Sequence, residues 1–108
     1  MKIRSVVALS AVALLLNLAV GGPAYADASV SIIDFDFSPG TVTISVGEAV
    51  TWTNNGDAPH TTTADGGAWD SGTLNPGQSF THGFAAAGSF PYHCNIHPNM
   101  VGTITVTP

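Results

Sequence analysis

Positive charge is nearly absent from this 108-residue chain. Lysine and arginine occur once each, as Lys2 and Arg4, so residues 27–108 carry seven acidic side chains and no Lys or Arg. Nucleic-acid binding depends on cations that neutralise phosphates, and anionic lipid surfaces would repel such a domain. The composition therefore excludes nucleic acid as a partner and favours a positively charged one.

Cysteine is equally scarce, because Cys94 is the single one in the chain. No disulfide can form within the chain. In an arbitrary exported domain, a lone cysteine is an inert buried thiol or forms a bridge to another chain. The residues around Cys94 favour a different role.

Long apolar runs are limited to the N-terminus. Residues 2–26 combine two basic residues, an apolar stretch of about fifteen residues and the ending Ala24-Tyr25-Ala26, a pattern typical of a secretory signal. We therefore expect residues 1–26 to be removed, leaving a domain of residues 27–108 that is periplasmic or extracellular. The alternative is an uncleaved anchor, but the apolar stretch is short for a bilayer span.

The remaining sequence is rich in Thr, Val, Ile and Phe and is broken by Gly, Pro and Asn, which predicts an all-β domain. Alternation is clear in residues 41–46, where Val42, Ile44 and Val46 share one face. A change of phase near Phe35 suggests a bulge or a kink in the first strand. Seven or so short strands favour a two-sheet sandwich. The expected strands are 29–37, 41–46, 50–53, 60–64, 78–84, 90–94 and 101–106.

The chemistry is concentrated near the C-terminus, where Cys94, His97 and Met100 have the spacing C-x2-H-x2-M. One short loop can direct all three side chains at one point. His60 follows Pro59 in a turn far upstream, and loops of a sandwich gather at its ends. Two imidazoles and a thiolate with a weak thioether contact are the ligands of a type 1 copper site. The sequence therefore predicts a single copper ion bound by His60, Cys94, His97 and Met100.

Two other functions use a similar set of ligands. A copper-storage or copper-delivery protein could hold Cu(I) in the same pocket. An enzyme could hold zinc by one cysteine and two histidines, with a water in fourth place. Met100 argues against zinc, which takes N, S⁻ and O ligands.

Residues 29–106 resemble a cupredoxin of the plastocyanin and amicyanin group. The resemblance lies in Phe37-Ser38-Pro39, in residues 46–52, in Pro59-His60 and in Tyr92-His93-Cys94 onward, and the short ligand loop resembles that of amicyanin. It implies a Greek-key β-sandwich of about seven to eight strands that is not an enzyme. It also implies a soluble one-electron carrier, with His60, Cys94 and His97 as strong copper ligands and Met100 as the axial one.

The resemblance also implies partners, namely a larger redox protein as donor and another as acceptor. Given the acidic charge, we expect a basic docking face on them, such as that of a c-type cytochrome. Electrons should pass through the edge of His97, within an apolar patch that includes Ala58, Pro59 and Pro98. The sequence contains no oligomerisation signal, so we expect a monomer.

Two positions depart from the family pattern. Thr61 stands where family members often have an Asn that ties the two ligand loops together, which predicts a looser surrounding of the site. Ile96 stands where plastocyanin and amicyanin have Pro. Because Ile has an amide hydrogen, we expect the Ile96 N–H to donate to the Cys94 sulfur and raise the reduction potential.

Overall fold

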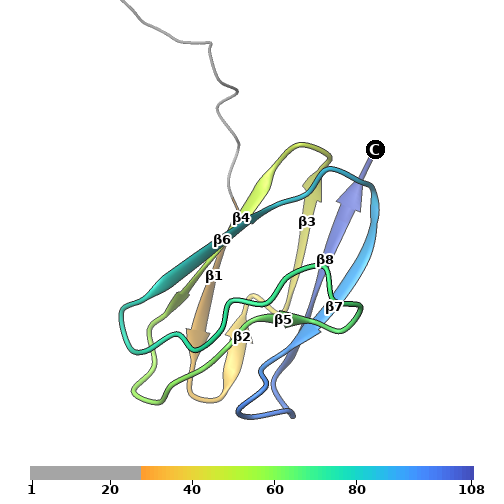
Figure 1. The fold of residues 1–108 in the computed structure, drawn as a ribbon. Helices are drawn as coiled ribbons and strands as arrows, with labels where there is room; N and C mark the ends of the chain where they lie inside the picture. The colour runs from red at the N-terminus through yellow and green to blue at the C-terminus, as the bar shows by residue number, and fades with distance from the viewer. Residues whose placement is uncertain (1–27) are drawn as a thin grey trace, which may run out of the picture.

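The computed structural model describes residues 28–108, and the predicted export signal of residues 1–26 lies outside them. The described residues form eight strands and no helix (Figure 1). Accordingly, they contain no helix able to span a membrane. The strands are β1 (Ala28–Ile33), β2 (Asp36–Ser38), β3 (Thr41–Ser45), β4 (Ala49–Asn54), β5 (Thr63–Ala64), β6 (Ser79–Gly83), β7 (Gly88–His93) and β8 (Val101–Thr107).

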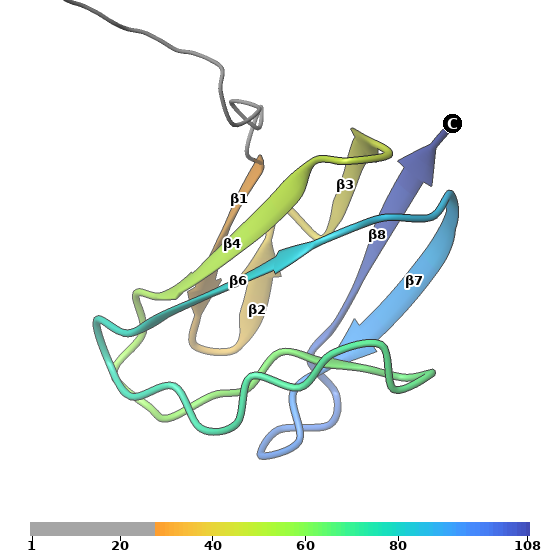
Figure 2. The ribbon, with the colours of Figure 1, turned by 45° about the horizontal axis from the view of Figure 1, so that its top comes forward.

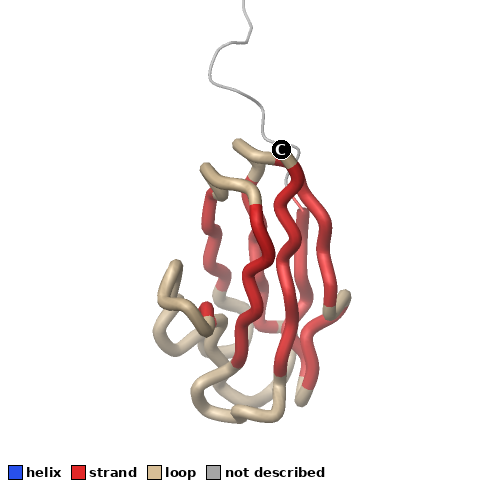
Figure 3. The backbone as a smooth tube through the Cα atoms, turned by 90° about the vertical axis from the view of Figure 1, so that its right-hand side faces the viewer, coloured by secondary structure: helices blue, strands red, loops and turns tan. Residues whose placement is uncertain are grey.

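The strands form two four-stranded sheets, in the orders β2-β1-β4-β6 and β3-β8-β7-β5. Neighbours in a sheet are often distant in sequence, and β1 pairs with β4, and β3 with β8, in parallel. Such pairs require connections that cross from one sheet to the other. Figure 3 shows the strands along the length of the body and loops at both ends. The predicted β-sandwich is confirmed.

Alternating apolar residues account for the sheets. Val42 and Ile44 of β3 are buried between exposed threonines, as the sequence predicts. Val46 is wrongly predicted to join them, because β3 ends at Ser45 and the Val46 side chain is 42% exposed. Its amide instead donates to the carbonyl of Thr107, at the end of β8.

Aromatic rings fill the space between the sheets, in place of a disulfide. Trp52 lies at the centre, with ring centroids 5.4 Å from Trp69 and 5.5 Å from Tyr92. Phe37 packs edge-on against Tyr92 at 4.7 Å. Burying one such ring removes roughly 150–250 Å² from water, worth about 4–6 kcal/mol at about 25 cal/mol per Å². Trp69 therefore belongs to the core, although it lies in a long connection.

Two strand predictions need correction. Residues 29–37 are not one bulged strand but a hairpin, in which β1 pairs antiparallel with β2 and Ile33 lies opposite Asp36. The phase change marks the turn at Asp34 and Phe35. The strand predicted at 60–64 is reduced to β5, and His60 makes an isolated bridge to Leu74 instead.

Three connections gather at the end of the sandwich away from the C-terminus. They are the β1–β2 turn, the segment that follows β4, and the segment between β7 and β8 (Figures 1 and 2). The site predicted from sequence lies among these connections.

Candidate metal centre

The C-terminal ligand loop begins where β7 ends at His93. Period two along β7 turns Tyr92 and Cys94 inward, and both are buried. The loop is closed by two backbone hydrogen bonds, from the Cys94 amide to the Met100 carbonyl at 3.1 Å and from the Met100 amide to the His97 carbonyl at 2.9 Å. The seven-residue spacing thus forms a compact turn that directs three side chains to one side.

His60 reaches the same place from the connection between β4 and β5. Its backbone exchanges two hydrogen bonds with Leu74, at 3.1 and 2.7 Å. The preceding segment is organised by the buried side chain of Asn54, whose Nδ2 donates to the carbonyls of Ala58 and Leu74. The Asn54 Oδ1 accepts from the amide of Gly56. The His60 side chain is fully buried, and its backbone is held by the two bonds to Leu74.

The side-chain atoms have the spacing of a metal site. The Cys94 Sγ lies 3.8 Å from Nδ1 of His60 and 3.9 Å from Nδ1 of His97. All three atoms lie within 4.8 Å of one another. With bonds of about 2.0 Å to nitrogen and 2.3 Å to sulfur, a trigonal centre places nitrogen and sulfur about 3.7 Å apart. The two distances from sulfur to nitrogen therefore match the spacing of a trigonal metal site.

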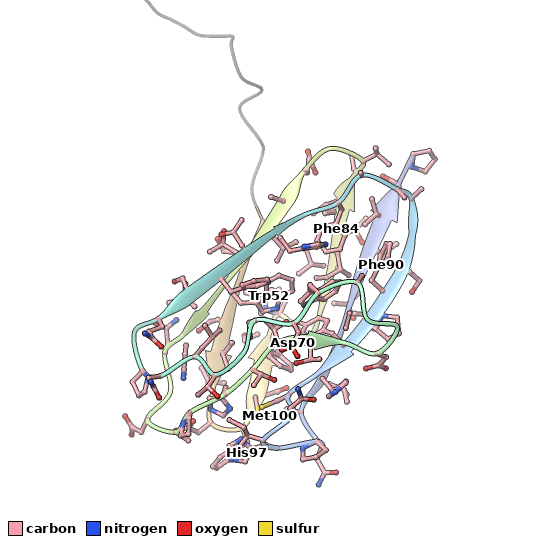
Figure 4. The ribbon with its side chains drawn as sticks, in the orientation of Figure 1. Trp52, Asp70, Phe84, Phe90, His97 and Met100 are labelled. Atoms are coloured by element: carbon pink, nitrogen blue, oxygen red, sulfur yellow. The ribbon has the colours of Figure 1, made fainter. Side chains whose placement is uncertain are left out.

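Met100 is buried beside this group. It lines a hollow together with His97 and Phe35. Figure 4 shows the side chains of His97 and Met100 at the same end of the sandwich. A thioether at this place suits a soft ion and leaves less room for a water or substrate. The axial contact of Met100 remains a prediction.

Thr61 ties the two ligand loops together. Its amide donates to the Cys94 sulfur at 3.3 Å, and its Oγ1 accepts from the Asn95 amide at 2.8 Å. The same hydroxyl lies 2.9 Å from Oγ1 of Thr63. The Thr61 hydroxyl therefore makes a loop-to-loop bond, and the looser surrounding expected from a threonine in place of an asparagine stays a prediction.

The second departure has no visible effect on the sulfur. Within residues 28–108, no hydrogen bond joins the Ile96 amide to Cys94, so the expected second backbone donor is not found. The Ile96 side chain is instead 42% exposed, beside His97. Its contribution here is apolar surface.

Sequence reasoning missed two residues at the tip of the β1–β2 turn. Asp34 Oδ1 accepts a 2.6 Å hydrogen bond from Nε2 of His60. The ring of Phe35, 62% exposed, packs edge-on against His97 with centroids 4.9 Å apart. The His60 contact, followed by the amide of Asp57, holds the pKa of Asp34 below its usual value. The phase change at this turn was the available signal.

His93 faces away from the metal centre, as period two predicts. Its Nδ1 lies 2.5 Å from Asp65 and its Nε2 lies 2.8 Å from the side-chain oxygen of Asn95. The contact with Asp65 is the main cause that raises the pKa of His93. His82 is also distant, stacked on Trp69 at 5.2 Å. Neither belongs to the His60, Cys94 and His97 group.

Comparison with known families agrees with this geometry. The family model described as a cupredoxin-like domain matches residues 6–106. The chain belongs to the cupredoxin family. The sandwich and the His-Cys-His group are thus features of a cupredoxin.

The relatives of this cupredoxin include a plastocyanin and an amicyanin. The chain is 41% identical over 83 residues to a chloroplastic plastocyanin of Tetradesmus obliquus, covering 65% of this chain but only 57% of that protein. It is 33% identical over 82 residues to amicyanin-alpha of Methylorubrum extorquens, covering 71% and 69%. A purple cupredoxin from Nitrosopumilus maritimus has a similar structure, with a TM-score of 0.69 and 33% identity over 74% of this chain and 99% of that one.

Proposed function

We propose that this cupredoxin binds one copper ion through His60, Cys94, His97 and Met100 and carries single electrons between larger redox proteins. The observation that supports this most is the placement of two imidazole nitrogens at 3.8 and 3.9 Å from one buried thiol sulfur. Thiolate and thioether favour Cu(I), whereas imidazole suits both oxidation states. Bound copper would supply the one-electron change between Cu(II) and Cu(I).

The protein's part is to hold the ligands still. His60 and Cys94 are fully buried, and Thr61 bonds to both loops. Ligands that cannot move hold copper in a geometry between those that Cu(II) and Cu(I) prefer. The site then changes little when an electron is gained or lost, so the reorganisation energy is small. With Met100 in the fourth place, no position is left for a substrate, which supports a carrier over an enzyme.

The surface offers one route for the electron. His97 is the partly exposed member of the group, and Phe35, Ile96 and Pro98 surround it with apolar surface. Of the expected patch, Pro98 lines this hollow and the β1–β2 turn adds Phe35, while the contribution of Ala58 and Pro59 stays a prediction. We propose that donor and acceptor dock here.

Metal analysis, a visible spectrum and voltammetry of the purified protein test this function. We expect one copper per chain, an intense thiolate-to-Cu(II) band and a reversible one-electron wave. Cys94→Ser should abolish the band, because the thiolate is its source. His82→Gln is the matched control, because His82 lies in β6 and stacks on Trp69 away from the site. That variant should keep the colour.

The alternatives give different results. Colourless Cu(I) that is held without cycling would instead indicate a copper-delivery protein. Zinc at one ion per chain, with turnover of a substrate, would indicate an enzyme. Retention of the band in Cys94→Ser would exclude the site proposed here.

We also propose that residues 1–26 direct export and are then removed, so that the domain of residues 27–108 acts outside the cytoplasm as a monomer. The support is the basic start, the apolar run and the small residues before Asp27. Mass spectrometry of the protein from its native host should give a chain that begins at Asp27.

A further inference from the structure

The carboxylate of Asp34 is enclosed by donors from the first ligand loop. Besides His60, it accepts from the amides of Asp57 at 2.8 Å and Ala58 at 3.3 Å. Gly56 passes so close that a Cβ on it would overlap Oδ1 of Asp34. The loop before His60 is therefore shaped around this one side chain.

The contact determines which nitrogen of His60 faces the metal. A carboxylate can only accept, so Nε2 of His60 must carry the hydrogen that it shares with Asp34. The neutral ring then keeps its lone pair on Nδ1, the atom 3.8 Å from the Cys94 sulfur. A carboxylate behind a metal-binding histidine fixes the tautomer and ring orientation and increases the basicity of the ligand.

We propose that Asp34 is a positioning residue for the copper site and that its negative charge lowers the reduction potential. This inference rests on the proposed function. Part of the Asp34 side chain is open to water, but its hydrogen bond holds the negative charge against the buried ring of His60, where it favours Cu(II), the more positive ion, over Cu(I). The turn between β1 and β2 thus tunes a site whose ligands all lie elsewhere in the chain.

Two substitutions separate the hydrogen bond from the charge. Asp34→Asn keeps an acceptor oxygen but removes the charge, and Asp34→Ala removes both. Both should lower the ratio of Cu(II) to Cu(I) affinity by about tenfold, within the range typical of such outer partners, which is a rise of about 59 mV for one electron. Protein-film voltammetry gives the potential, and competition with a Cu(I) chelator gives the affinity.

Asp57→Asn is the matched control. It removes one charge from the same loop, while the backbone amide that bonds Asp34 remains. We expect its affinity ratio to change less than twofold. Equal shifts in Asp34→Asn and Asp57→Asn would overturn the inference, because general surface charge would then explain them.

A measurement without copper tests the positioning separately. ¹⁵N NMR of the metal-free protein should show the neutral His60 ring with its hydrogen on Nε2. Asp34→Ala should populate the other tautomer. Hydrogen on Nδ1 in the unaltered protein would overturn the inference even if the variants fail to fold.

These results distinguish two failures. If the protein is blue and cycles between Cu(II) and Cu(I), but the Asp34 substitutions leave its reduction potential unchanged, only the inference about Asp34 is contradicted. A protein that binds no copper contradicts the proposed function, and the tautomer of His60 still decides whether Asp34 positions it.

Discussion

Thr61 joins the two ligand loops through two of its groups, its backbone amide and its side-chain hydroxyl. Its amide is committed to the Cys94 sulfur and its hydroxyl to the Asn95 amide. The side chain is buried, so water cannot easily replace the hydroxyl. A residue with the same shape but no hydroxyl would leave the Asn95 amide without that acceptor.

Thr61→Val should therefore destabilise the metal-free protein. An unsatisfied amide near the core costs about 1–3 kcal/mol, and urea unfolding followed by tryptophan fluorescence measures the loss. Thr81→Val is the control, since Thr81 also bonds another hydroxyl, at 2.7 Å from Thr51, but on the exposed face. That change should stay within about 0.5 kcal/mol. Similar losses of unfolding free energy in both variants would show that the loop-to-loop bond stabilises the protein no more than an exposed hydroxyl pair does.

At this scale, the sequence predicts local relations better than distant ones. Cys94, His97 and Met100 lie within seven residues, so their spacing alone indicates a shared loop. His60 could also be predicted as a site residue, because a Pro-His turn in a sandwich is expected at one of its ends, where the C-terminal ligand loop also lies. Asp34 could not be predicted as a site residue. Its hydrogen bond to His60 joins residues 26 positions apart and depends on the position of the β1–β2 turn.

The β7–β8 pair supports the C-terminal ligand loop, and its register places Tyr92 opposite Gly102. A Cβ on Gly102 would lie 2.5–2.8 Å from the ring and hydroxyl of Tyr92. Tyr92 cannot move easily, because Trp52, Trp69 and Phe37 pack around it. Burial also raises the pKa of Tyr92 to about 12, so its hydroxyl stays neutral.

Gly102→Ala should consequently cost about 1–3 kcal/mol of folding free energy, as overpacking of a full core does. Thermal and urea unfolding measure the loss. Gly66→Ala is the matched control, because no atom lies within 4 Å of its added Cβ. If Gly102→Ala proves as stable as Gly66→Ala, the core at Tyr92 is less tightly packed than this geometry indicates.

The elements also explain why the sequence pattern predicts one interrupted strand where the structure has a hairpin. Ile32 and Phe37 are both buried, and an uninterrupted strand needs a bulge to bring them to one face. A hairpin gives the same burial pattern, because β2 returns beside β1 with Ile32 opposite Phe37. The two residues of the turn are Asp34 and Phe35, and neither is the Gly or Asn that usually marks such a turn in a sequence.

The charged side chains of Asp, Glu, Lys and Arg in residues 27–108 are all negative. Beyond Arg4 the chain contains seven acidic residues and no Lys or Arg, and Asp34, Asp36, Asp57, Asp65 and Asp70 are on the surface. Because opposite charges are absent, the field of the molecule is not cancelled locally. Such a field steers oppositely charged partners and increases their association rate.

Electron transfer with a basic c-type cytochrome should therefore slow as salt is added. The Debye length falls from about 30 Å at 0.01 M to about 10 Å at 0.1 M, so the second-order rate constant should drop roughly tenfold over this range. Stopped-flow mixing that follows the visible band of the oxidised copper site measures it. An acidic cytochrome is the control, and its rate should rise with salt because repulsion is screened. A flat dependence with both cytochromes would mean that the acidic residues do not steer docking and that the apolar surface around His97 selects the partner alone.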